Sequence, residues 1–109
     1  MNYDKNNIFA KILRGEIPCK KVYENDHVLV IPKGEYVDLN DFNSKASDKE
    51  IVELNRAVTH VANLMGAKDN GYRALTNIGR DGGQEVPHLH FHIFAGEKIG
   101  KMVGWWFQE

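Results

Sequence analysis

The amino-acid sequence predicts an α+β fold in which an antiparallel sheet is combined with one long and one short helix. Two observations favour this class. A short helical pattern is followed by strand patterns, and a long amphipathic helix then separates these from a second group of strands. A glycine-rich turn joins the last two strands of the chain. The 109 residues are enough for one domain with a core, which we take to be residues 1–109.

The first half of the chain contains a short helix and two strands. The helix is predicted over residues 8–14, after Asn6 or Asn7 as its cap. Strands are expected over residues 21–23 and 28–31, where apolar and β-branched side chains gather.

The second half contains the long helix and a hairpin. Residues 47–50 (Ser-Asp-Lys-Glu) form a capping box, so a helix is predicted from there to about Met65. One apolar stripe of this helix is expected to face the core: Ile51, Leu54, Val58, Val61 and Met65. His60 lies beside the stripe and is expected to have no functional role. Residues 72–77 and 85–94 are predicted to form a hairpin around the glycine loop.

Composition excludes several classes of protein. Hydrophobic residues make up 42% of the chain, charged residues 27%, and the net charge is −1, as in a soluble globular protein. This charge gives no basic surface for a nucleic-acid polymer, so none is expected as a partner. No apolar run reaches membrane-spanning length, and the polar start is not typical of a signal peptide. A single cysteine, Cys19, suits a reducing compartment. We therefore expect a cytoplasmic protein with no membrane partner.

The most informative segment is Val86–Phe94, in which three of the five histidines alternate with large apolar residues. Successive side chains of a strand point to opposite faces, so His88, His90 and His92 are expected to share one face. This row has three interpretations. It can be a strand with partly exposed histidines, or a metal site completed by a carboxylate from elsewhere. It can also serve covalent catalysis, in which one imidazole attacks and a neighbour acts as acid or acceptor.

The segment 77–85 leads directly into the histidines. Its glycines allow backbone N–H groups to approach an anion closely. Asn77 and Gln84 add uncharged hydrogen-bonding groups, and Arg80 adds a positive charge. By themselves, residues 81–83 (Asp-Gly-Gly) are typical of a hairpin turn. Beside three histidines, a phosphate or oxyanion cradle is an equal alternative.

Residues 82–96, which contain the run Gly-Gly-Gln-Glu-Val-Pro-His-Leu-His-Phe-His-Ile-Phe, resemble the signature of the histidine triad (HIT) nucleotide-binding family, in its Hint-like branch. Residues 8–18 resemble the opening helix of the family, and residues 29–33 and 73–77 resemble its central strands. The resemblance extends over nearly the whole chain and implies the HIT-like antiparallel sheet.

The resemblance also implies an activity. Members cleave at the α-phosphate of nucleoside phosphoramidates or adenylylated amines and release a nucleoside monophosphate. By this resemblance His90 is the nucleophile that forms a nucleotidyl-histidine, His92 contacts the phosphate and the leaving group, and His88 orients the other two. The implied phosphate-binding residues are Asn77, Gly83, Gln84, Glu85 and Val86. This chemistry needs no metal or other cofactor, and the expected substrate is an AMP-like purine nucleotide.

The sequence departs from the family pattern at two places. Before residues 29–33, about fourteen residues are absent, enough for a strand and its turn, so one strand fewer than usual is expected. That segment normally supplies the acidic residue that holds the ribose. Residues 21–24 then either form a tight hairpin with the next strand or continue into it. At the second place, Glu35 replaces a histidine that normally lies behind the triad. Glu35 either accepts a hydrogen bond from His88 and favours its imidazolium, or is a solvated turn residue.

Two other functions stay open. A nucleotide-binding or regulatory relative with weak catalysis is one, because the ribose-binding segment is missing, and a metal-binding protein is the other. The aromatic tail Trp105-Trp106-Phe107 predicts a homodimer, since three exposed aromatic side chains in a monomer would form a hydrophobic surface patch that favours association. The alternative is that this tail folds back on its own core.

Overall fold

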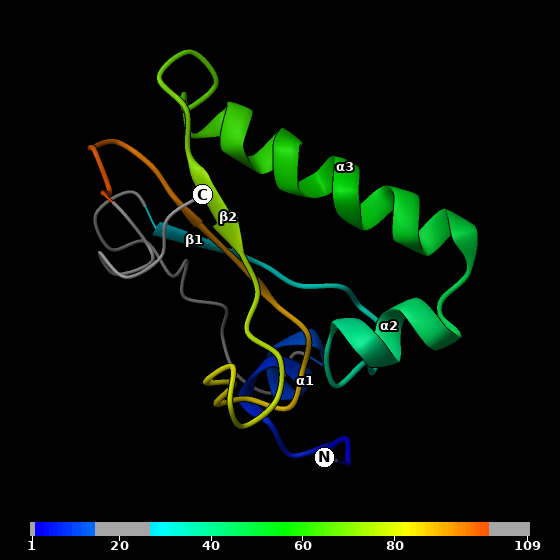
Figure 1. Ribbon diagram of the computed structural model, residues 1–109. Coiled ribbons are helices and arrows are strands. Elements are labelled where there is room, and N and C mark those ends of the chain that lie inside the picture. Colours follow the sequence, from blue (N-terminus) through cyan, green and yellow to red (C-terminus); the bar gives the residue numbers. More distant parts are fainter. Residues whose placement is uncertain (1, 15–26, 101–109) are drawn as a thin grey trace, which may run out of the picture.

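The computed structural model describes residues 2–14 and 27–100. Strands β1 (His27–Val30), β2 (Arg73–Leu75) and β3 (Phe91–Phe94) form an antiparallel sheet in the order β1-β3-β2 (Figure 1). The mixture of helices with an antiparallel sheet confirms the predicted α+β class.

Two helices begin at the residues that the sequence indicates. Helix α1 (Ile8–Leu13) is capped by Asn7, whose side chain accepts a hydrogen bond from the backbone N–H of Ala10. Helix α3 (Asp48–Leu64) begins at the predicted capping box, with both of its reciprocal hydrogen bonds present. Each cap satisfies backbone N–H groups that a helix leaves without partners in its first turn.

A third helix, α2 (Leu39–Lys45), was not predicted. It has seven residues, and four of them have low helix propensity: Asn40, Asp41, Asn43 and Ser44. It buries only Phe42, so the sequence contains no apolar stripe to indicate it. The available signal was its cap, Asp38, whose carboxylate accepts from the N–H of Asp41.

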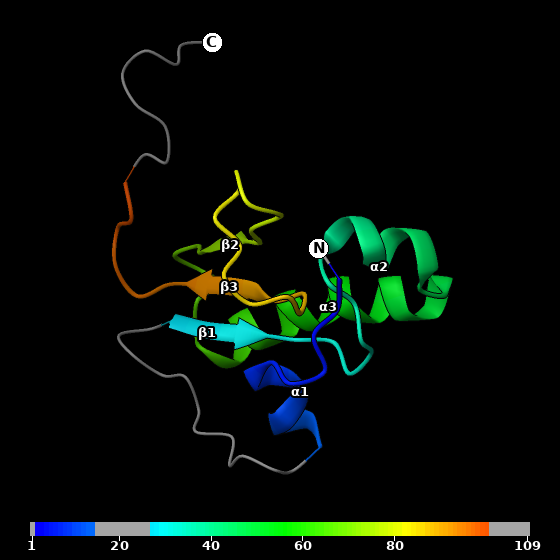
Figure 2. The ribbon, with the colours of Figure 1, turned by 90° about the horizontal axis from the view of Figure 1, so that it is seen from below.

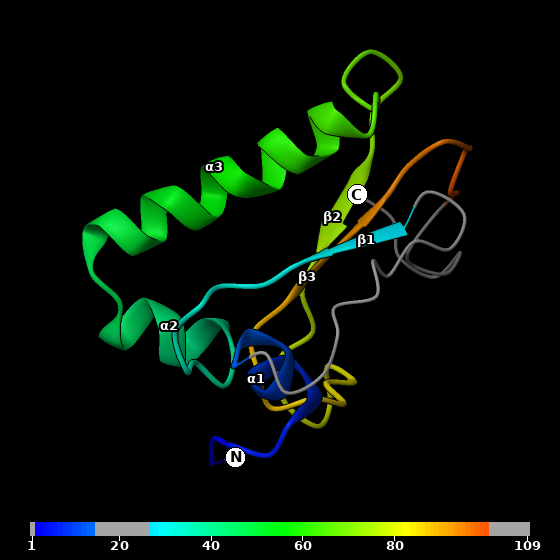
Figure 3. The ribbon, with the colours of Figure 1, turned by 180° about the vertical axis from the view of Figure 1, so that it is seen from behind.

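Helix α3 covers one face of the sheet, and α2 contributes Phe42 to the same core. The buried core there contains Val30, Phe42, Leu54, Ala62, Leu89 and Ile93. The predicted apolar stripe of α3 packs against this core, and His60 is exposed, as expected. Figures 1 and 3 show α3 running alongside the sheet with α2 near its first turn, and Figure 2 shows α1 on the β1 side. The histidine-bearing face is therefore the one turned away from α3.

The predicted hairpin is present, but its second strand is shorter than expected. β2 and β3 are paired, whereas residues 85–90 lie outside β3, so only His92 belongs to the regular strand. Pro87 has no N–H to donate to a ladder. The N–H of His88 bonds to Val86 O at 2.8 Å, and that of Leu89 bonds to Tyr36 O at 2.8 Å. These local and long-range bonds replace the pairing that a longer strand would need.

Some expectations fall on residues that the structure does not describe. They are the strand over residues 21–23, the environment of Cys19, and the contact of Trp105, Trp106 and Phe107 with a second subunit. In the described part of the chain, no helix is long and apolar enough to cross a membrane.

Candidate active site

The loop between Asn77 and Gln84 is closed by its own hydrogen bonds. The N–H of Gly83 donates to Arg80 O, and the side chain of Asn77 donates to Gly82 O at 2.7 Å. Gly83 has a φ of 76°, a conformation that favours glycine. A Cβ at Gly82 would overlap the carbonyl oxygen of Ile78. The Gly-Gly pair is therefore required by the shape of this loop.

Gln84 joins the loop to the chain that follows β1. Its side chain is buried, and its amide nitrogen donates to Val37 O at 2.6 Å and to Val86 O at 3.0 Å. Its amide oxygen accepts from the N–H of Gly79 at 2.9 Å. Both ends of the amide are thus engaged with backbone groups. In contrast, the backbone N–H groups of Glu85 and Val86 donate to no acceptor among the described residues.

His88 is completely buried, and both of its ring nitrogens have partners. Nε2 lies 3.0 Å from Pro32 O, and Nδ1 lies 2.7 Å from the hydroxyl of Tyr3. A carbonyl oxygen can only accept, so Nε2 carries the hydrogen and Nδ1 accepts from the tyrosine. Burial lowers the pKa of His88, with a further lowering by His90, against the opposite effects of Pro32 O and Glu35. His88 is therefore held as the neutral imidazole.

Glu35 does not make the hydrogen bond to His88 that the sequence suggested as one alternative. Its side chain is exposed, and the two nitrogens of His88 are occupied by other groups. The carboxylate acts on His88 only through its charge, which favours the protonated ring. Glu35 is thus closer to the other alternative, a solvated turn residue.

His90 is oriented by the backbone of His88. Its Nδ1 lies 2.7 Å from His88 O, so Nδ1 donates and the lone pair is on Nε2. The ring also contacts Phe9 of α1, with ring centroids 5.0 Å apart. The carbonyl of His90 itself accepts from the hydroxyl of Thr76 at 2.7 Å. Ring and backbone are both fixed, in the tautomer that presents a nucleophilic nitrogen.

His92 is paired with a histidine from the neighbouring strand. Its Nδ1 lies 2.9 Å from Nε2 of His27 in β1, and its ring centroid lies 5.1 Å from that of His90. The ring of His27 stacks against both His92 and Phe94, at centroid distances of 5.1 and 4.3 Å, and these two rings also stack on each other at 5.8 Å. Burial lowers the pKa of His92, and the charges of His90 and His27 lower it further.

The structure therefore brings the three predicted histidines together and adds residues that sequence analysis did not assign to the site. Tyr3, Phe9, His27 and Thr76 contact them from four different segments. His27 and Tyr3 are 65 and 85 residues away from their partners, and no local pattern indicates such contacts. His27 had a usable signal, because it begins the strand that pairs with β3.

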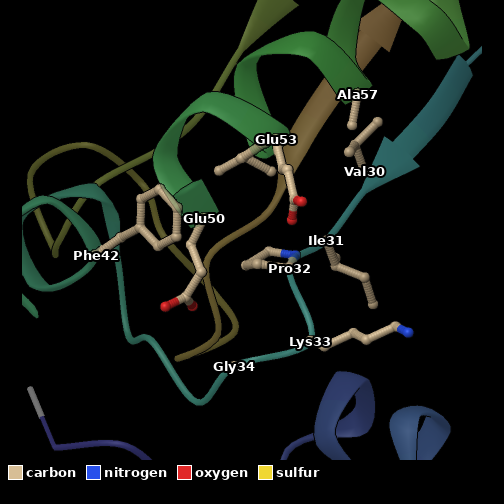
Figure 4. Close-up of a pocket in the computed structure, with 10 residues that line it drawn as sticks. Val30, Ile31, Pro32, Lys33, Gly34, Phe42, Glu50, Glu53 and Ala57 are labelled. Carbon is tan, nitrogen blue, oxygen red and sulfur yellow. The ribbon is translucent and has the colours of Figure 1, made fainter. Parts of the chain in front are cut away.

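Two further observations concern ligands. Within residues 2–14 and 27–100, no group of three or more potential ligands is arranged to hold a metal ion. A cavity of about 460 Å³ lies between α3 and the chain after β1, with Glu50, Glu53 and Pro32 among its lining residues (Figure 4). None of the three histidines lines it, although Pro32, whose carbonyl oxygen bonds to His88, does.

Comparison with known proteins shows the family of this chain. The model of the HIT domain matches residues 14–99, and the chain belongs to the histidine triad (HIT) family. A HIT-like protein of Azospirillum brasilense is 53% identical over 115 residues, which cover 93% of this chain and 94% of that protein. The purine nucleoside phosphoramidase of Escherichia coli is 32% identical over 110 residues, which cover 88% of this chain and 92% of that protein.

Solved structures show the same fold. A histidine triad protein from Clostridium difficile matches with a TM-score of 0.74 and 38% identity, over 94% of this chain and all of that one. A HIT family hydrolase from Clostridium thermocellum matches with a TM-score of 0.77 and 30% identity, over 92% and 99% of the two chains.

The alignment with the Azospirillum protein has 115 positions, whereas this chain has 109 residues. The alignment therefore contains gaps in the sequence of this chain.

The buried amide of Gln84 leads to a first prediction. In Gln84→Glu, a carboxylate oxygen replaces the amide nitrogen that donates to Val37 O and Val86 O. This buried oxygen then faces two carbonyl oxygens, and none of the three can donate a hydrogen bond. We expect a loss of about 1–3 kcal/mol of unfolding free energy near neutral pH. Burial raises the pKa of such a carboxyl, so the deficit should shrink as the pH falls toward about 4.3. Urea denaturation at several pH values measures this, with exposed Glu85→Gln as control. A deficit that is independent of pH would contradict the argument.

The neutral histidines lead to a second prediction. The pKa values of His88 and His92 are lowered by burial, whereas histidine in an unfolded chain has a pKa of about 6.5. The unfolded state therefore binds more protons, and stability should fall as the pH is lowered through about 6.5. Urea denaturation of wild type between about pH 7.5 and about pH 5.5 should show this slope.

Two variants assign the slope to the site. His92→Gln should reduce it, because one of the responsible groups is removed, while exposed His60→Gln should leave it unchanged. An equal slope in both variants would exclude His92 as a source.

Proposed function

We propose that this chain is a nucleotide hydrolase that cleaves nucleoside phosphoramidates or adenylylated amines at the α-phosphate. The observation that carries the proposal is the tautomer of His90, whose Nδ1 donates to His88 O and whose Nε2 therefore has a free lone pair. The hydrolase and phosphoramidase names of two relatives support the same reaction class.

In the first step, Nε2 of His90 attacks the α-phosphorus. A bond forms between this nitrogen and phosphorus, and the bond from phosphorus to the amine breaks. The imidazole becomes positively charged, and the carbonyl of His88 stabilises this charge through the hydrogen bond from Nδ1. The amine leaves with the electron pair of the broken bond and needs one proton.

We assign the donation of that proton to His92. The anionic phosphate of a bound substrate favours protonation of a nearby imidazole, while burial lowers the pKa of His92. The phosphate lets His92 hold a proton, and burial favours its loss. His92 can therefore give this proton to the amine and return to the neutral state. In the second step, water attacks the phosphorus, its proton passes to His92, and the bond to His90 breaks. The product is a nucleoside monophosphate.

The phosphate oxygens need donors, and the loop before the histidines can supply them. The N–H groups of Glu85 and Val86 have no described acceptor and are the best candidates. We propose that Gln84 and Asn77 act mainly by holding the loop, since their amides bond to its backbone. Gly83 contributes the turn that lets the backbone approach an anion.

A nucleotide-binding relative with weak catalysis is the second candidate. The gaps in the alignment with the Azospirillum protein favour it, because a missing segment can remove contacts to the substrate. Binding of AMP without turnover of a phosphoramidate would identify this case. Turnover abolished by a chelator would instead favour the metal-binding alternative.

The central prediction is a covalent nucleotide on His90. After rapid quenching of a reaction with an AMP–tryptamine phosphoramidate, intact-mass spectrometry should show an added AMP on the wild-type chain. His90→Gln should show none, with turnover reduced by several orders of magnitude, as expected for loss of a nucleophile. His60→Gln serves as the matched control and should retain both adduct and turnover. An adduct that persists in His90→Gln would refute the assignment.

A fourth prediction concerns the selectivity of nucleotide binding. If the phosphate dominates binding and the ribose-binding acid is absent, loss of the 2′-hydroxyl should have little effect on affinity. Calorimetry with AMP, 2′-deoxy-AMP and GMP should give dissociation constants within about tenfold of one another, or about 1.4 kcal/mol. A larger preference would show that another group has taken over recognition of the ribose or base.

A further inference from the structure

We propose that Tyr3 is a positioning residue of the histidine site, whose hydroxyl holds the ring of His88 and, through the backbone of His88, the attacking ring of His90. The phenol oxygen lies 2.7 Å from His88 Nδ1. The part of this inference that concerns rate rests on the proposed function. The part that concerns the tautomer of His88 does not.

The ring of His88 is buried in the protein interior. Its side chain has no exposed surface, so each ring nitrogen needs a partner within the protein. Pro32 O can serve only Nε2–H, which leaves Nδ1 as an acceptor. The hydroxyl of Tyr3 is the described group that donates to it. Without this hydroxyl, the ring would keep a buried nitrogen with no donor.

The backbone of His88 links its ring to the ring of His90. The carbonyl that receives Nδ1–H of His90 belongs to the backbone of His88. The ring of His88 is held from two sides by segments far apart in the sequence, residues 2–4 and the chain after β1. A ring fixed at both nitrogens restricts rotation of its own residue, and so restricts the direction of the carbonyl.

Tyr3 is itself held by the turn that precedes α1. The chain between Tyr3 and α1 is a compact turn, in which the N–H and the side-chain amide of Asn7 both donate to Asp4 O, at 3.0 and 2.6 Å. The side chain of Asn7 is buried and also caps α1. In addition, Phe9 packs its ring against both His88 and His90. The segment before α1 is thus built to present Tyr3 to His88.

The surroundings of His88 agree with this role. The groups with charge or a titratable proton that face it are Tyr3, His90 and Glu35. Glu35 favours the charged ring, whereas a phenol that donates to Nδ1 favours the neutral one. Tyr3 therefore opposes protonation of His88.

The experiment compares Tyr3→Phe with Tyr72→Phe. The first substitution removes only the hydroxyl and keeps the ring that packs at 5.6 Å from His88, and the second alters a tyrosine at the far end of the sheet. The main readout is the ¹⁵N resonances of the His88 ring in histidine-labelled protein. We expect Tyr3→Phe to shift Nδ1 of His88, and Tyr72→Phe to leave it in place.

The kinetic readout is turnover of the AMP–tryptamine phosphoramidate. We expect kcat to fall about tenfold in Tyr3→Phe, with KM changed less than about twofold, because the loss affects orientation of the attacking ring. Incorporation of 3-fluorotyrosine at position 3 provides a variant that keeps the fold and the hydrogen bond but makes the phenol a stronger acid. It should shift Nδ1 of His88 without the tenfold loss.

Several outcomes would overturn the inference. Unchanged His88 resonances in Tyr3→Phe and with fluorotyrosine would show that the hydroxyl does not hold the ring. Shifted resonances with unchanged kcat would show that holding the ring does not position His90. If wild type has no turnover at all, the proposed function fails, while the resonances still decide whether Tyr3 sets the tautomer of His88.

Discussion

The histidine site depends on three backbone carbonyl groups in the chain that follows β1. Pro32 O accepts from the ring of His88, Tyr36 O accepts from the N–H of Leu89, and Val37 O accepts from the amide of Gln84. Buried donors must find acceptors, and these three lie within one short segment. The path of residues 84–89 is therefore determined by contacts with this segment more than by pairing within the sheet.

This constraint also decides where hydrogens lie on the rings. A carbonyl oxygen can only accept, so Pro32 O and His88 O each select one tautomer of the histidine that they contact. Among the residues that the structure describes, this orientation involves no buried carboxylate, whose charge would favour imidazolium over the neutral nucleophile. Burial acts in the same direction, since it lowers the pKa values of His88 and His92.

The sequence was sufficient for those features that depend on neighbours along the chain. The Asn7 cap, the Ser47–Glu50 capping box and the alternation of histidines with Leu89 and Ile93 are local patterns, and the structure agrees with them. The early end of the strand was not predictable in the same way, because the N–H of Leu89 finds its acceptor on Tyr36, far away in the sequence.

The partners of the histidines follow the same rule. Tyr3 and His27 meet His88 and His92 only because the fold brings distant segments together. For Glu35 the sequence left two alternatives open, a hydrogen bond to His88 and a solvated turn residue, and only the fold shows that the side chain is exposed and the nitrogens of His88 have other partners. Helix α2 escaped prediction because a short helix with one buried side chain has no periodic pattern.

Glu50 connects the first turn of α3 to Tyr36, in the chain that follows β1. One carboxylate oxygen closes the capping box with the N–H of Ser47, and the other accepts from the hydroxyl of Tyr36 at 2.6 Å. Tyr36 in turn supplies the carbonyl that holds Leu89. If the first turn of α3 frays, the side chain of Glu50 is released. The hydroxyl of Tyr36 then loses the acceptor that holds the chain after β1 in place. We infer that the two regions open as a single cooperative unit, with amide protons at both places exchanging by one shared event.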